Sequence, residues 1–424
     1  MLSSRLPKDL SPSPFFAELE RAKACAKKGA AEGGLSFIDM TVSSPVKAGL
    51  PVDLSAAVEE ARKDFGCWNP DAAGWKSARE AVVEYYRERG GNFTAGQIIL
   101  TASTSEAYSV LFKTFCDPGD VILTPMPGYP LLDTLAQLEH LECAPYFLQL
   151  KREKSSFRFV LDSDSLLAAP EKAKILLLVS PHNPTGHCVS REEWNVAVRF
   201  CEENDMILVV DEVFGDYGFS NKVSRTWKYV FGACHPERRN KFGVNSEHLW
   251  DAGGNDLINL PENGPKCPIF WLNGLSKAVG SPQLKLGWMA FYAPRERFEE
   301  IRAALEFVED AYLSVSAPAQ ALGTSLLPKA AAYETQVKER LLANWQTLRE
   351  AFPAKYCPEV LGGWYAVVRL GEDDEELTLR LLKEKHVLVQ PGFFFDFDED
   401  GWVVISLLQE PATFKEAVQR MKEL

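Results

Sequence analysis

Lys277 is the residue of this sequence whose setting most favours chemistry. It lies in the stretch WLNGLSKAVGSPQLKLGW, residues 271–288, directly after an apolar, strand-like run and among small residues. An apolar setting disfavours a charged amine, so it lowers the pKa of a lysine. A lysine with a lowered pKa is a nucleophile that can form a Schiff base with a carbonyl compound. A second lysine, Lys285, follows ahead of Gly287.

Two further polar side chains stand at the ends of apolar runs. Asp211 follows the run 206–210, and a carboxylate there needs a partner because an unpaired buried charge is costly. A protonated nitrogen of a heterocyclic ring would be such a partner. Asn183 follows the run 174–180 within SPHNPTG, a stiff turn in which an X-Pro bond can be cis. Its amide either binds a ligand or belongs to a structural turn.

Three hydroxyl side chains, Ser103, Thr104 and Ser105, follow the strand-like run 97–101 and begin a helical segment. Backbone N–H groups at the start of a helix, together with hydroxyls, are suited to binding phosphate. The alternative is a simple N-cap, which serine and threonine often form.

The elements that position these residues form an alternating pattern. Short, β-rich apolar runs are separated by amphipathic helical segments, and they predict strands at 97–101, 120–124, 174–180, 206–212, 268–273 and 285–293. Continuous apolar strands that alternate with helices indicate the α/β class, with a mainly parallel sheet. Open sheets of this class bind ligands at the carboxyl ends of their strands, where the residues above lie.

The chain is expected to hold more than one domain because 424 residues exceed the usual size of one core. After residue 294 the pattern changes to long helices, 294–323 and 329–352, and then to a mixed α+β segment. The predicted division is an N-terminal arm and part of a small domain at 1–50, a large domain at 51–324, and the C-terminal small domain at 325–424.

The segment 218–267 interrupts the large domain. It is rich in Gly, Asn, Lys and Glu and lacks periodicity, so it is either an inserted functional element or a mobile flap. Because it lies between Asp211 and Lys277, we expect it to border the substrate entrance.

Composition argues against several classes of partner. The net charge is −13 and no block of Lys and Arg occurs, so nucleic acid and anionic membrane surfaces are not expected as partners. No apolar run has the length of a membrane span, and no secretory signal is recognised. Nine cysteines without a CxxC pair are typical of a reducing compartment, so we expect a cytoplasmic location and no metal site.

The order of phosphate cradle, amide, carboxylate and lysine, each at the end of a strand, resembles that of a known family. This family is the fold-type I, pyridoxal-phosphate-dependent aminotransferases of class I/II, the aspartate-aminotransferase-like enzymes. Further segments that are similar to its motifs extend the resemblance to nearly the whole chain: 68–82 (WNPDAAGWKSAREAV), 117–130 (DPGDVILTPMPGYP), 362–370 (GGWYAVVRL) and 387–395 (VLVQPGFFF). The resemblance implies a seven-stranded type of sheet in the large domain, and a smaller α+β domain built from both termini.

The resemblance also implies pyridoxal 5′-phosphate as the cofactor and a role for each site residue. Lys277 would form the Schiff base and carry the proton from the substrate carbon, and Asp211 would keep the cofactor's ring nitrogen protonated. Asn183 would bind the phenolic oxygen of the ring, and Tyr129 would stack on its face. The phosphate would be held by Ser103, Thr104, Ser105, Ser276 and Lys285. Trp68 stands near the position that meets the partner subunit's phosphate, which implies a homodimer with shared active sites.

Two cofactor-binding positions depart from the family pattern. Phe214 stands where the family's Asp-x-x-Tyr motif has tyrosine, so no phenol can donate to the cofactor's ring oxygen from there. We therefore expect a raised pKa for the imine of the bound cofactor, unless Tyr217 reaches in instead. Lys285 replaces an arginine, and it keeps the charge but not the two-pronged hydrogen bonding. The result is looser holding of the cofactor, unless a point charge suffices.

Two substrate-binding positions depart as well. Val404 in GWVVIS stands where the family has the arginine for the substrate's α-carboxylate, and Ser43 replaces a glycine of the N-terminal loop. Three explanations are open. Another basic residue takes over, from Lys47, Arg369 or the segment 218–267; or the substrate is an amine, an amino-sugar-like compound or an ester without that carboxylate; or the alignment slips locally.

The sequence thus predicts an aminotransferase that passes an amino group between an amino donor and a keto acid through Lys277. The replacements at Val404 and Phe214 keep a second hypothesis open, a pyridoxal-phosphate-dependent lyase or decarboxylase on the same fold. The acidic segment 306–312 either indicates a substrate other than an acidic amino acid or is a solvated helix face.

Overall fold

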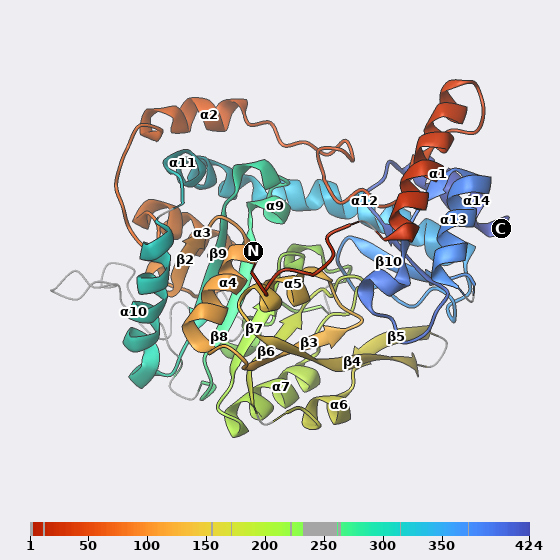
Figure 1. Ribbon diagram of the computed structural model, residues 1–424. Coiled ribbons are helices and arrows are strands. Elements are labelled where there is room, and N and C mark those ends of the chain that lie inside the picture. Colours follow the sequence, from red (N-terminus) through yellow and green to blue (C-terminus); the bar gives the residue numbers. More distant parts are fainter. Residues whose placement is uncertain are drawn as a thin grey trace.

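A computed structural model describes most of the chain in two connected units (Figure 1). The described residues are 3–11, 13–153, 156–170, 172–220, 223–231, 261, 264–313, 315–371 and 373–424. Within them, no helix combines the length and the apolar character that crossing a membrane requires.

An eight-stranded sheet forms the larger unit, in the order β2-β9-β8-β7-β6-β3-β4-β5. The strands β3, β4, β6, β7 and β8 run parallel to their neighbours within this group, whereas β2, β9 and β5 pair antiparallel. The strands are β2 (Ile98–Thr101), β3 (Val121–Met126), β4 (Glu142–Glu153), β5 (Ser156–Leu161), β6 (Ala173–Val179), β7 (Ile207–Asp211), β8 (Ile269–Gly274) and β9 (Gly287–Tyr292). The predicted α/β class is confirmed; the sheet has one strand more than the seven-stranded type because β5 pairs with the far half of β4.

Side chains of the central strands alternate between two cores, one on each face of the sheet. In β7, Leu208 and Val210 join one core, whereas Ile207 and Val209 join the other. This two-sided burial explains the continuous apolar runs of the sequence. The helices α3 (Lys76–Glu88) and α7 (Arg191–Glu203) cover the first face, and α4 (Thr104–Phe115), α5 (Leu131–Leu138) and α10 (Arg295–Tyr312) cover the second.

The smaller unit combines the two ends of the chain. Its antiparallel sheet has the order β10-β13-β12, with β10 (Tyr365–Arg369), β12 (Gln390–Pro391) and β13 (Trp402–Ser406). A separate parallel pair joins β1 (Ile38–Asp39) near the N-terminus to β11 (Val387–Leu388). The helices are α1 (Pro14–Ala31), which packs on α13 (Asp374–Lys385), and α12 (Ala330–Ala351), which packs on α14 (Pro411–Lys422). Figure 1 shows this unit to the side of the larger sheet, with α12 extending between the two.

The helix predicted at 294–323 is instead two helices. The first, α10, ends at Tyr312, and Leu313 has a positive φ of 67° that an α-helix cannot continue through. The second, α11 (Ala317–Leu326), carries Pro318 in its first turn, where the missing N–H is not needed. The remaining short helices are α2 (Ser55–Ala61), α6 (Ser163–Leu167), α8 (Lys228–Phe231) and α9 (Leu275–Ala278).

Candidate active site

A cavity of about 280 Å³ lies at the carboxyl ends of the parallel strands. The structure brings together here many residues that the sequence singled out: Ser43, Ser103, Thr104, Ser105, Tyr129, Asn183, Asp211, Ser276 and Lys277. These residues come from six separate segments of the chain. Their meeting follows from the sheet, because parallel strands present all their carboxyl ends at one edge.

Lys277 lies in the short helix α9, which begins directly after β8. Burial lowers the pKa of its amine to about 8, and the charge of Asp211 opposes this effect. Its backbone carbonyl accepts a hydrogen bond of 2.6 Å from the hydroxyl of Tyr217. Tyr217 therefore holds the turn that carries the lysine. The sequence had also left open a direct contact between Tyr217 and the cofactor, but the hydroxyl is used here instead.

Asp211 is the last residue of β7 and has two hydrogen-bond donors. The hydroxyl of Tyr108 donates to Oδ2 at 2.8 Å, and the backbone N–H of Val213 donates to Oδ1 at 3.0 Å. Burial raises the pKa of this carboxyl, while both hydrogen bonds and the charge of Lys277 act in the opposite direction. Tyr108 was not among the residues predicted from the sequence, although it follows Thr104 by four residues and so shares its face of α4.

Small residues and hydroxyls form the opposite end of the cavity. Ser103 is the N-cap of α4, and its hydroxyl accepts from the backbone N–H of Glu106 at 3.2 Å. Gly287 lies so close that a Cβ there would be 3.1 Å from the backbone carbon of Ser103, and one at Gly274 would be 3.0 Å from the Cα of Gly287. Backbone groups therefore approach this end without intervening side chains, which suits an anionic group at a helix N-terminus.

Asn183 projects into the cavity from the turn after β6. Its Oδ1 is buried and has no hydrogen-bond partner among the described residues. The bonds Ser180–Pro181 and Asn183–Pro184 are cis, as the sequence allowed. A buried amide oxygen without a partner is costly, so this side chain is suited to a ligand that supplies a polar group.

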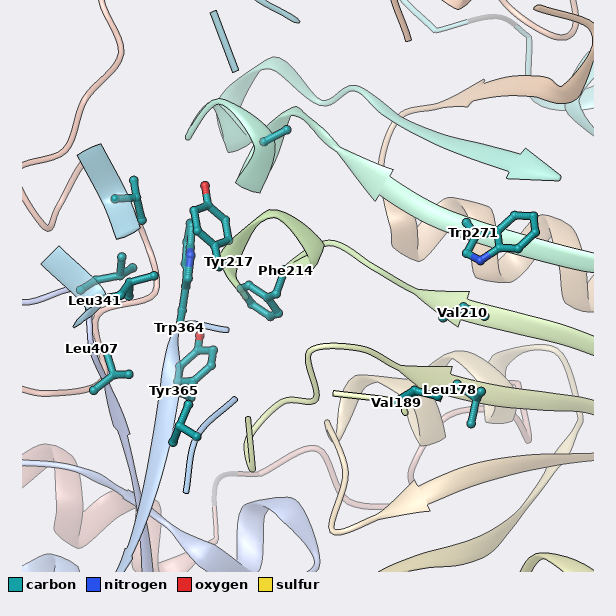
Figure 2. Packing of buried hydrophobic residues seen from close by; sticks show 14 of the residues in the cluster. Leu178, Val189, Val210, Phe214, Tyr217, Trp271, Leu341, Trp364, Tyr365 and Leu407 are labelled. Atoms are coloured by element: carbon teal, nitrogen blue, oxygen red, sulfur yellow. The ribbon is translucent and has the colours of Figure 1, made fainter. Parts of the chain in front are cut away.

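Aromatic side chains of both units lie close to the lysine. The amine of Lys277 lies 4.7 Å from the centre of the Trp364 ring and 5.4 Å from that of Phe214. Figure 2 shows Phe214, Tyr217, Trp364 and Tyr365 side by side; Tyr365 begins β10, and Trp364 directly precedes it. Tyr365 also lines the cavity. Trp364 and Tyr365 were not among the predicted site residues, although both belong to the family-like segment 362–370.

A buried network of charges fixes the loop after Asp211. Arg225 Nε lies 2.6 Å from Glu212 Oε2, and its Nη1 lies 2.8 Å from Asp216 Oδ1. Arg89 Nε lies 2.8 Å from the same oxygen of Asp216. Burial alone would raise the pKa of Asp216, but the charges of Arg89 and Arg225 outweigh it and lower that pKa. Glu212 and Asp216 are thus paired within the interior and stay out of the cavity.

Four predicted residues do not line the cavity. Lys285 is exposed, with a left-handed φ of 52°, at the end of the turn before β9. Trp68 is 77% exposed, and Lys47 is exposed as well. Arg369 pairs with Glu399. The roles proposed for these four side chains stay predictions.

Val404 is fully buried in β13, opposite Val367 of β10 and Gln390 of β12. Its side chain contributes to the core of the smaller unit. Most of the segment 218–267 lies outside the described residues, so the prediction that it borders the substrate entrance stays a prediction. The described start of this segment is anchored beside the site, where Gly218 pairs with Gly362 and Arg225 enters the charged network.

Comparison with known proteins gives one consistent family. The family described as aminotransferase class I and II matches residues 52–421. Tyrosine aminotransferase of Mus musculus is 26% identical over 92% of this chain and 80% of its own length. Glutamate-pyruvate aminotransferase AlaA of Haemophilus influenzae is 23% identical over 83% of this chain and 81% of its own.

Among solved structures, an aspartate aminotransferase double mutant of Thermus thermophilus superposes with a TM-score of 0.76 at 22% identity. The match covers 100% of this chain and 99% of that one. It confirms the fold, and the names of the relatives favour transamination over the lyase or decarboxylase reaction. The chain belongs to the class I and II aminotransferases and is an enzyme that transfers amino groups.

Proposed function

We propose that this aminotransferase uses pyridoxal 5′-phosphate, bound in the cavity around Lys277, to pass an amino group from an amino donor to a keto acid. The observation that carries the proposal is the pairing of a buried amine of lowered pKa with a buried carboxylate in one cavity. Two titratable groups with shifted pKa values in one cavity are typical of an active site.

The residues of the cavity fit this cofactor at each of its functional groups. The N-terminus of α4, with Ser103, Thr104 and Ser105, suits the phosphate because Gly274 and Gly287 leave room for close backbone approach. Asp211 suits a protonated ring nitrogen, and Asn183, whose amide lines the cavity, would donate from Nδ2 to the ring's phenolic oxygen. Tyr129, 46% exposed at the cavity wall, suits the face of the ring.

When bound, the cofactor supplies an aldehyde for the amino group and a ring that withdraws electrons from the substrate carbon. The protein supplies the proton transfer. Lys277 accepts the proton from the substrate carbon at Nζ and later returns it, and a pKa of about 8 allows both directions near neutral pH. Asp211 would supply a negative charge to the cofactor's ring nitrogen, and Tyr108 orients that carboxylate.

Absorption spectroscopy of the purified, cofactor-loaded protein tests the proposal. A donor should remove the absorption band of the bound aldehyde form, and a keto acid should restore it. Tyrosine, alanine and glutamate are the first donors to test, after the names of the relatives. Amines that lack a carboxylate follow, because the buried Val404 stands where the family has an arginine for that carboxylate. A Lys277→Ala variant should bind the cofactor without this cycle. Release of ammonia with an unchanged band would contradict transamination and indicate a lyase.

We further propose a cytoplasmic homodimer in which each subunit completes its partner's site, with domain boundaries at 1–50, 51–324 and 325–424. The exposed Trp68, at 77%, supports a subunit contact, since large apolar side chains at such exposure often mark interfaces. Size measurement in solution by light scattering tests the dimer, and a Trp68→Ala variant should weaken it.

A further inference from the structure

Trp364 comes from the smaller unit but is fixed against the larger one. The backbone N–H of Gly363 donates to the carbonyl of Tyr217 at 3.0 Å, and that of Phe219 donates to the carbonyl of Leu361 at 2.8 Å. Gly362 packs so tightly on Tyr217 that an added Cβ would lie 2.8 Å from its carbonyl oxygen. The segment that carries Trp364 is therefore held at a defined place beside the active-site loop.

The indole ring of Trp364 is fully buried, and its neighbours are aromatic. Its ring centre lies 5.2 Å from that of Tyr217 and 5.4 Å from that of Phe214. The amine of Lys277 lies 4.7 Å from the Trp364 ring and 5.4 Å from the Phe214 ring. Both distances are within the range of about 6 Å in which a cation is attracted to an aromatic ring.

Within the described part of the chain, the charged group that acts on this amine is Asp211, at the end of β7. Tyr108 of α4 acts on the amine through its hydrogen bond to that carboxylate. The phenol of Tyr217 is committed to the carbonyl of Lys277. The Trp364 and Phe214 rings are further groups beside the amine that compensate its protonated form for lost water.

We propose that Trp364 and Phe214 form a cation–π clamp that stabilises the protonated form of the Lys277 side chain. Trp364 is then a positioning residue that acts on the proton-transferring amine from the smaller unit. The clamp deepens the proposed function, because Lys277 becomes a cation each time it takes a proton from the substrate carbon. Without the clamp, burial would lower the pKa of the amine further.

A second role for Trp364 must be separated from this one. Its Nε1 is buried and has no hydrogen-bond partner among the described residues, so the indole N–H itself is a possible donor to a ligand. A Trp364→Phe variant keeps an aromatic face and removes the N–H, whereas Trp364→Leu removes both. The clamp predicts that phenylalanine largely preserves the proton affinity of Lys277, and donation by the N–H predicts that it does not.

The test measures the pKa of Lys277 in the full chain freed of cofactor. The probe is an amine-reactive label, and the extent of labelling at Lys277 is followed against pH by mass spectrometry. We expect Trp364→Leu to lower the pKa by about one unit and Trp364→Phe by less than half of that, from the strength of desolvated cation–π contacts. Trp345→Leu, in another buried tryptophan on α12, controls for loss of packing and should not shift it.

An unchanged Lys277 pKa in folded Trp364→Leu protein would overturn the clamp, and so would an equal fall in the phenylalanine and leucine variants. Should Trp364→Leu fail to fold, Phe214→Leu removes the other ring face and is expected to lower the same pKa. In the loaded enzyme, the acid limb of the pH profile of kcat should move with the pKa. The outcome is separate from the proposed function, since a pKa shift without transamination would support the clamp and refute that function.

Discussion

Removing the hydroxyl of Tyr108 is expected to weaken cofactor binding through Asp211. The hydroxyl donates to Asp211 Oδ2 at 2.8 Å, and the tyrosine is only 3% exposed. A Tyr108→Phe variant deletes one oxygen atom and keeps the ring in its place. Asp211 then retains the backbone N–H of Val213 as its donor.

The magnitude follows from the charge on the carboxylate. A hydrogen bond to a charged group contributes about 1.5–3 kcal/mol, which corresponds to about one to two pKa units. Because this bond lowers the pKa of Asp211 against the larger effect of burial, its loss raises that pKa further above the ordinary value of 3.8. A carboxyl whose pKa is higher in the folded state than in the unfolded state destabilises the fold increasingly as the pH rises above 3.8, and the loss is complete above the folded-state pKa. The variant should therefore lose most stability at neutral pH and less in acid.

The assay is a titration of the cofactor-free protein with pyridoxal phosphate, followed by fluorescence quenching. A carboxyl group that ionises less readily should bind the ring nitrogen less tightly. The Kd should therefore rise about tenfold or more, since each 1.4 kcal/mol is a factor of ten. Tyr146→Phe is the matched control, because the buried hydroxyl of Tyr146 donates to the carbonyl of Leu177 at 2.8 Å. The control should lose about 0.5–1.5 kcal/mol of stability, as expected for a hydrogen bond between neutral groups, and keep its affinity. Equal Kd values for Tyr108→Phe and the unaltered protein would refute the reasoning.

Three further predictions concern other parts of the site. A Phe214→Tyr variant should lower the pKa seen in the pH-dependent absorbance of the bound cofactor, because a phenol would donate to the cofactor's ring oxygen. A spectrophotometric titration that gives a higher pKa for the variant than for the unaltered protein contradicts this. Gly287→Ala should weaken cofactor binding in the same quenching titration, since the new Cβ would lie 3.1 Å from the backbone of Ser103, whereas unchanged affinity would place the phosphate elsewhere. Arg225→Met should lower the free energy of unfolding in urea by about 3–5 kcal/mol, because it removes the buried cation that pairs with Glu212 and Asp216.

The sequence was sufficient to predict the larger sheet and the residues at its strand ends. Strands buried on both faces need continuous apolar runs, and such runs are visible without a structure. A polar residue directly after such a run stands out, as Asp211, Asn183 and Lys277 do. Because parallel strands end at one edge, the meeting of these three residues in one cavity followed from the predicted topology.

Residues that act through tertiary contacts were missed for a physical reason. Tyr108 and Trp364 are apolar in most of their surface and lie in segments that are typical of core, so nothing local distinguishes them from packing residues. Arg225 lies in a segment whose composition indicated an inserted element or a mobile flap, yet it is buried because Glu212 and Asp216 neutralise it there. Such pairings depend on which segments the fold brings together.

The loop from Asp211 to Tyr217 shows how closely these functions are interleaved. Asp211 faces the cavity, whereas the neighbouring Glu212 turns inward to Arg225. Asp216 is held by the same arginine, and Tyr217 reaches the backbone of Lys277. Because the buried ion pairs fix the loop between its two functional ends, the carboxylate and the lysine are positioned by one rigid connection. A change in that network should therefore alter cofactor affinity as well as stability, although none of its charged groups lines the cavity.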